Sequence, residues 1–235
     1  MALKKRFYRT ATVTPELAAW RVQLDDRNLR SPAGAALALP GRELADAVAR
    51  EWQAQEDEID PATMPLFSLA VTVVDRVTPQ RDTVIAELTA YGGNDLLCYR
   101  DDTAELAQRQ HTDWQPWLDW VQKTHDIGLI PVSGIMPVDQ REAGKFSAVI
   151  ALFDDWRLGI LHRATSLSGS LVLGLGFVDG ALDSEQLFQL AFLDELWQNE
   201  KWGTDFEAAE RQQAIRAEFD HAARFLGLLP AAGRR

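Results

Sequence analysis

Two adjacent carboxylates in the last third of the chain, Asp194 and Glu195, could serve as a general acid and a general base. They belong to the segment 183–202, whose apolar periodicity predicts one amphipathic helix ending at Gly203, a residue typical of helix C-caps. At 100° per residue, Asp194 and Gln198 fall on the polar side of this helix, and Glu195 falls at its edge. An almost buried helix is therefore expected to present a narrow polar strip.

Paired carboxylates beside a histidine can perform general acid–base catalysis. His162 could meet Asp194 and Glu195 across adjacent helices, which would suit a small hydrolase or isomerase. A core histidine or a buried salt bridge explains the same residues without catalysis. The sequence has no P-loop, no nucleophile elbow and no helical pair of metal ligands, so we expect no catalytic centre, no cofactor and no metal. The hydrolase or isomerase stays open as an alternative function.

Without catalysis, two roles remain for the polar strip. It could be the solvated face of a core helix, or it could dock a partner, and periodicity alone does not separate the two. Trp202 follows the strip at the helix end and could be partly exposed, which suits a binding surface because tryptophan is enriched at interface hot spots. Trp52 instead completes an apolar stripe in the helix predicted over 43–55, and we expect it in the core.

The charge balance narrows the class of partner. The chain holds 35 Asp and Glu against 24 Lys and Arg, a net charge of −11, which disfavours nucleic acid. The sequence contains no run of 18 apolar residues, the length that a membrane-spanning helix needs. No apolar segment follows the basic N-terminus as a secretory signal would require. Cys98 is the single cysteine, so the chain has no internal disulfide and a reducing cytoplasm is expected.

The N-terminal pattern is that of strands followed by a helix. Alternating apolar residues over 7–13 and 20–24 predict a small antiparallel sheet, which is barely stable unless something covers it. The helix predicted over 43–55 offers an apolar stripe for that purpose.

The rest of the chain has helical periodicity, with long helices expected over 158–178 and 183–202. The sequence therefore predicts an α+β fold. A small N-terminal antiparallel β-sheet with helices forms domain 1–100, and an all-α helical bundle forms domain 101–235.

An ordered set of short motifs runs along nearly the whole chain. In chain order they include Arg6-Phe-Tyr8, Val22-x-Leu-Asp-Asp-Arg27, Leu44-Ala-x-Ala-Val-Ala-x-Glu-Trp-Gln-Ala-Gln55, Ile59-Asp-Pro-x-x-Met-Pro-Leu66, Asp75-Arg76, Asp95-Leu-Leu-Cys-Tyr-Arg100, Gln110 with Trp114-x-Pro116 and Trp120, and Asp194-Glu-x-x-Gln198 with Trp202-Gly203. Together they resemble the chaperone family that assembles mitochondrial and alphaproteobacterial F1-ATPase by binding its alpha subunit. The chain departs from that pattern at two places: Phe67 replaces a small polar residue, and Gly92-Gly93 replaces plainer helix residues.

This resemblance implies an orthogonal helical bundle and an ATP-independent chaperone without catalysis or cofactor. Its client would be the newly made, unassembled F1 alpha subunit, whose apolar surface aggregates until the beta subunit covers it. Through the Asp-Glu-x-x-Gln motif, the resemblance assigns client binding to Glu195, with Asp194, Gln198 and Trp202 as its neighbours. It also implies that Trp52 is critical for the fold.

A bacterial member acting in the cytoplasm is expected, with eukaryotic relatives in the mitochondrial matrix. We further expect a monomer that binds no nucleic acid and does not insert into membranes. A non-catalytic structural adaptor that stays in its complex is an alternative function, alongside the acid–base hydrolase that would use His162.

Overall fold

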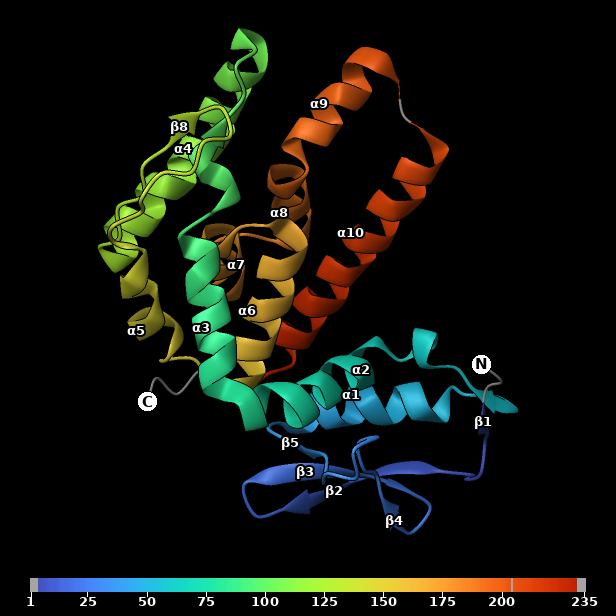
Figure 1. Ribbon diagram of the computed structural model, residues 1–235. Helices are drawn as coiled ribbons and strands as arrows, with labels where there is room; N and C mark the ends of the chain where they lie inside the picture. The colour runs from blue at the N-terminus through green and yellow to red at the C-terminus, as the bar shows by residue number, and fades with distance from the viewer. Residues whose placement is uncertain (1–3, 204, 232–235) are drawn as a thin grey trace. The chain divides into compact units, whose positions relative to one another are not determined.

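The computed structural model describes residues 4–203 and 205–231 of the chain (Figure 1). Contacts divide the chain into two compact units: unit 1 comprises residues 1–81 and 224–235, and unit 2 comprises residues 82–223. The predicted α+β class is confirmed, because small antiparallel sheets with helices precede a mainly helical part.

Unit 1 contains a four-stranded sheet with a helix across it, and a separate pair of short strands. Its elements are β1 Lys4–Lys5, β2 Ala11–Glu16, β3 Ala19–Leu24, β4 Arg27–Asn28, β5 Ala38–Leu39, α1 Arg42–Gln53, β6 Glu58–Ile59 and α2 Pro65–Thr72. Strands β2 to β5 form the four-stranded sheet, and β1 and β6 form the separate pair. β2 pairs antiparallel with β3, and α1 packs against both strands (Figure 1). The strand predicted from residue 7 begins only at Ala11, because the backbone N–H groups of Arg9 and Thr10 donate to the Asp25 carboxylate at 3.1 and 3.0 Å.

Trp52, on α1, lies in the core of unit 1 with only 6% of its surface exposed. Its ring makes edge contacts with Tyr8 and Phe67, at centroid distances of 5.6 and 5.0 Å. Phe67, one of the two departures from the family pattern, therefore fills space beside the tryptophan. The neighbouring Glu51 is also buried, and its carboxylate accepts from the backbone N–H groups of Leu66 and Phe67 at the start of α2.

Unit 2 is mainly helical. Its elements are α3 Arg81–Gly92, which begins at the last residue of unit 1, β7 Tyr99–Arg100, α4 Ala104–His125, β8 Val132–Ser133, α5 Phe146–Ile150, α6 Asp155–Ser168, α7 Leu171–Val178, α8 Ser184–Ala191, α9 Leu193–Trp202, and α10 Phe206–Gly227, which ends in unit 1. None of the described helices is long and apolar enough to cross a membrane. The division into domains 1–100 and 101–235 stays a prediction.

The helix predicted over 158–178 is two helices, α6 and α7. Gly169 follows α6 with a φ of 72°, a left-handed conformation that favours glycine. Ser170 then caps α7, because its Oγ accepts from the backbone N–H of Leu173 at 3.1 Å. The prediction of one helix is therefore wrong, because the apolar periodicity continues through a turn that these small residues form.

A fully buried carboxylate holds this turn in place. Asp95 accepts from the Ser170 hydroxyl at 2.7 Å and from the backbone N–H of Val172 at 3.0 Å, and so binds the first turn of α7. It also accepts from the backbone N–H of Leu97 at 3.0 Å, within the 3-10 turn Leu96–Cys98. Burial raises the pKa of Asp95 to about 6, although these donors oppose the shift.

Gly92, the other departure from the family pattern, permits a close approach at the end of α3. A Cβ at this position would lie 2.4 Å from a ring carbon of Phe146, which is itself fully buried. Any side chain here would displace that ring, so the glycine is required by the packing of α3 against the segment that carries Phe146.

Replacing Trp52 by arginine should destabilise the protein, because it places an unpaired charge among buried aromatic rings. The expected loss is about 3–5 kcal/mol in the free energy of unfolding, measured by chemical denaturation. Ala54→Arg is the matched control, since Ala54 is exposed at the end of the same helix. Equal stability of the two variants would show that Trp52 is not critical for the fold.

The buried Asp95 should make stability depend on pH. Its pKa of about 6 in the folded protein exceeds the ordinary value of 3.8, so the folded state holds the proton more tightly than the unfolded state. The contribution of Asp95 to the free energy of unfolding is therefore fully present below pH 3.8 and is lost as the pH rises through 6. The expected loss is on the order of 3 kcal/mol.

The readout is the difference in unfolding free energy between wild type and Asp95→Asn at pH 4, 5 and 7. Wild type should lose stability relative to the variant as the pH rises, because only wild type carries this titrating carboxyl. Parallel pH curves for the two proteins would contradict the assignment.

Candidate functional site

The segment 183–202, predicted as one helix, is also broken. α8 ends at Ala191, and Phe192 adopts φ −108° and ψ 17° before α9 begins. The Phe192 ring stacks on the Phe188 ring with centroids 4.8 Å apart, so both rings stay in the core through the turn. The break places Asp194 and Glu195 in the first turn of α9, where unpaired backbone N–H groups favour acidic side chains. The prediction of a single helix is wrong.

Asp194 faces α4. Its Oδ1 accepts from the side-chain amide of Gln110 at 2.8 Å, and that glutamine is 1% exposed. The same amide group accepts from the backbone N–H of Asp101 at 2.7 Å, so both ends of the Gln110 side chain are bonded. Burial raises the pKa of Asp194, while the Gln110 hydrogen bond and the Arg100 charge act to lower it. Asp194 is thus a half-buried packing contact between α4 and α9.

Glu195 faces α10 instead. Its Oε2 accepts from the Arg211 guanidinium at 2.6 Å and from the Gln212 side-chain amide at 3.2 Å. The Glu195 side chain keeps 39% of its surface exposed, whereas Gln212 is buried. Glu195 therefore connects α9 to α10 and still presents part of its carboxylate to solvent.

Gln198 and Trp202 face outward. Gln198 is exposed, and Trp202 is 74% exposed at the end of α9. The Trp202 ring meets the edge of the buried Trp197 ring at a centroid distance of 5.7 Å, which orients it without covering it. The four residues expected in one strip therefore point in three directions: Asp194 toward α4, Glu195 toward α10, and Gln198 with Trp202 toward solvent.

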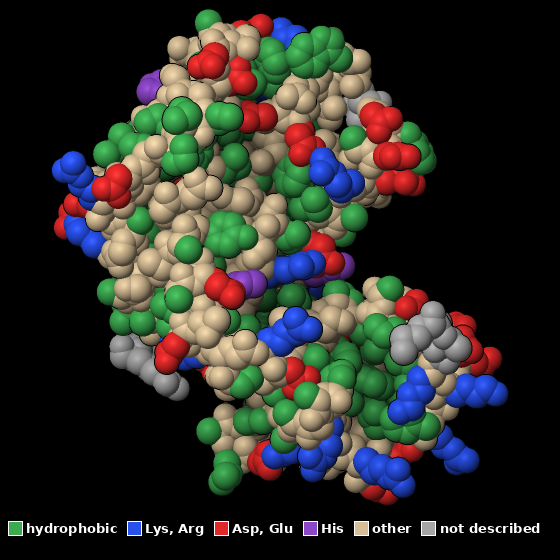
Figure 2. All heavy atoms as spheres, viewed as in Figure 1, with side chains coloured by type: hydrophobic (Ala, Val, Ile, Leu, Met, Phe, Trp, Pro, Cys, Tyr) green, Lys and Arg blue, Asp and Glu red, His purple; other side chains and the backbone are tan. Residues whose placement is uncertain are grey.

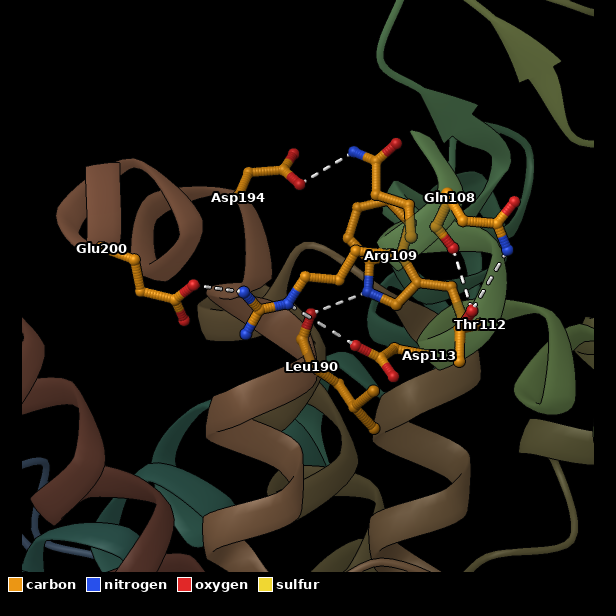
Figure 3. Close-up of polar contacts among 9 residues, drawn as sticks. Gln108, Arg109, Thr112, Asp113, Leu190, Asp194 and Glu200 are labelled. Carbon is orange, nitrogen blue, oxygen red and sulfur yellow. Dashed lines mark hydrogen bonds and ion pairs between the residues drawn. The ribbon is translucent and has the colours of Figure 1, made fainter. Parts of the chain in front are cut away.

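A groove that the periodicity did not predict lies between α4 and the α8–α9 segment. It consists of two adjoining hollows of about 330 and 360 Å³, and both are lined by Arg109 and Asp113. Figure 3 shows Arg109 reaching from α4 toward α9, where its guanidinium donates to Glu200 at 2.6 Å; Asp113 lies 3.9 Å away. The Arg109–Asp113 pair could have been found from its i, i+4 spacing, but the Glu200 partner could not.

His162 does not join the carboxylates of α9. Its Nε2 lies 3.5 Å from the Glu87 carboxylate on α3, and the adjacent Arg163 donates to Glu218 at 2.7 Å on α10. Because Asp194 and Glu195 bind other partners, the acid–base arrangement with His162 is not formed. Among the described residues, no cluster of three or more His, Cys, Asp or Glu could hold a metal ion.

The charge imbalance of the chain is concentrated in unit 2. Residues 82–223 hold 24 Asp and Glu against ten Lys and Arg, a net charge of −14, whereas the rest of the chain is net positive. Figure 2 shows acidic side chains gathered around the start of α10, where Asp205, Glu207 and Glu210 are exposed. The face of α9 that carries Trp202 thus belongs to a strongly acidic unit.

Both sequence and fold match one group of known proteins. The family model described as ATP12 chaperone protein matches residues 5–122. The crystal structure of Atp12 from Paracoccus denitrificans superposes with a TM-score of 0.92 at 38% identity, covering 97% of this chain and 99% of that one. A proposed chaperone from Agrobacterium tumefaciens gives a TM-score of 0.89 at 37% identity, covering 97% and 87% of the two chains. The mitochondrial protein atp12 of Schizosaccharomyces pombe is 22% identical over 221 residues, 88% of this chain and 76% of that protein.

Glu195→Lys should loosen α10 without unfolding the protein. The Glu195–Arg211 pair is well exposed, and such pairs contribute about 0–1 kcal/mol, so the thermal midpoint should fall by no more than about 4 °C. Backbone amides of 206–216 should exchange hydrogen faster, because Arg211 and Gln212 lose their acceptor.

Adding Arg211→Glu to Glu195→Lys reverses the pair and should restore the slow exchange. If the single variant melted more than about 10 °C below wild type, Glu195 would be a determinant of the fold and not a local connection.

Proposed function

The chain belongs to the ATP12 chaperone protein family, and from this we propose that it binds the unassembled alpha subunit of the F1-ATPase. This is a family of chaperones for ATP synthase assembly and not of enzymes, so the hydrolase or isomerase that would use His162 is excluded. We propose that binding keeps the alpha subunit from aggregating until the beta subunit replaces the chaperone. Such an exchange needs competition between surfaces and no ATP.

The observation that carries this proposal is the exposed indole of Trp202 on the outer face of α9. Trp202 keeps 74% of its surface exposed, and tryptophan anchors are common in protein interfaces. Gln198 lies exposed on the same helix, and the Glu195 carboxylate is partly accessible. We assign these three residues to client contact and Asp194 to the support of the helix that carries them.

We further propose that the protein acts as a monomer in the bacterial cytoplasm. The likeness to bacterial structures and the single cysteine, Cys98, which is buried, support this location. Burial raises the pKa of the Cys98 thiol to about 12, so it stays protonated and unreactive.

The direct test is whether the protein suppresses light scattering by purified, unassembled F1 alpha subunit. Wild type should suppress aggregation at near-equimolar ratio, and Glu195→Lys and Trp202→Ala should each lose most of this activity. Asp119→Lys is the matched control, since it reverses an exposed charge on α4 outside the assigned face. Full activity of both α9 variants would refute the assigned face, and no activity of wild type would refute the client.

A structural adaptor would remain in the finished complex, whereas a chaperone leaves it. Pull-down from cell extract should therefore recover alpha subunit without beta, and assembled F1 should contain none of this protein. Its presence at fixed stoichiometry in purified F1 would favour the adaptor.

A further inference from the structure

The groove between α4 and the α8–α9 segment has an apolar floor. Trp117 from α4, Leu190 from α8, and Leu193 and Trp197 from α9 line its two hollows. On the α4 side it runs from Glu105 to Trp117, about 18 Å at a helical rise of about 1.5 Å per residue. That length matches roughly five or six residues of extended chain.

The rim of the groove is acidic. Glu105, Asp113, Glu185 and Glu200 line it, and Arg109 is the one basic side chain among its lining residues in the described part of the chain. Lys201 pairs with Glu105, Arg216 with Glu185 and Arg109 with Glu200, so three of these four charges are offset. The surrounding unit still carries a net charge of −14, so the groove lies in a negative potential that attracts cations.

We propose that this groove binds an unfolded client segment in which lysine or arginine alternates with large apolar residues. The inference rests on the proposed chaperone function and adds a second contact surface to the face of α9. In an extended segment, successive side chains point to opposite sides, so apolar residues can reach the floor while basic residues reach the rim.

The ion pairs across the groove can give way to basic side chains of such a segment. The Arg109–Glu200 and Lys201–Glu105 pairs join α4 to α9, and all four side chains are at least 37% exposed. Pairs as exposed as these contribute little to stability. A basic side chain of the client can therefore replace Arg109 or Lys201 on its carboxylate without loss of the fold.

The test uses the full-length protein and two labelled seven-residue probes, one alternating leucine with lysine and one alternating leucine with glutamate. Fluorescence anisotropy should show binding of the lysine probe that weakens with added salt, and much weaker binding of the glutamate probe. Failure of the lysine probe to bind, or equal binding of the two probes, would overturn the proposal.

Two double variants test whether the lysine probe binds in the groove. Gln108→Lys with Gln189→Lys adds two positive charges at the rim without removing an ion pair, because both glutamines are exposed groove residues. The lysine probe should bind this variant about tenfold more weakly. Gln122→Lys with Gln213→Lys adds the same charge to exposed positions of unit 2 outside the groove lining and should change affinity little. Equal weakening by both pairs would mean that the overall charge of unit 2, and not the groove, attracts the probe.

The aggregation assay separates this proposal from the chaperone function on which it rests. If wild type protects the alpha subunit and the groove variant protects it equally, the groove is not a client site and the function stands. If wild type fails to protect the alpha subunit but binds the lysine probe in the groove, the function fails and the groove remains a peptide-binding site.

Discussion

A buried glutamine amide determines where the candidate site lies. Gln110 is almost fully enclosed, and its amide must be bonded at both ends, because an unsatisfied buried polar group costs about 1–3 kcal/mol. One end accepts from the backbone of Asp101, and the other donates to Asp194, 84 residues away. One turn further along α4, the indole N–H of Trp114 donates to the Leu190 carbonyl at 2.9 Å. These two bonds fix the α8–α9 segment against α4.

The orientation of α9 follows from this constraint. Because Asp194 is turned toward α4, the next residue along the helix is turned about 100° away and meets α10 through Arg211 and Gln212. The faces toward α4 and α10 are then occupied, and the remaining face, which carries Gln198 and Trp202, is exposed. The exposed surface is therefore the part of the helix that packing does not use, and Asp194 belongs to its support.

The sequence predicts elements whose periodicity is strong and local. The helix of Trp52 and the burial of that residue follow from its apolar stripe, whereas the position of Trp202 at a helix end left its exposure open. The two helix breaks cannot be predicted from the sequence pattern, because each depends on distant contacts. The turn at Ser170, for example, is held by Asp95, 75 residues earlier in the chain. The groove was not predicted for the same reason. Arg109 and Glu200 are 91 residues apart, and nothing in the sequence around either residue indicates that they pair.

Reversible binding without ATP places a physical limit on the contacts involved. On the proposed function, the client must be held well enough to stay soluble and still be released to a competing subunit, so the interaction cannot depend on many buried, fully desolvated pairs. Exposed ion pairs and one partly anchored aromatic ring meet this condition, because each can be replaced by an equivalent contact from the competitor. The negative potential of unit 2 then acts mainly on the rate of encounter with a basic segment, and less on how long the complex lasts. Fast capture with moderate residence is what a protein requires if it is to occupy a surface that another subunit will later cover.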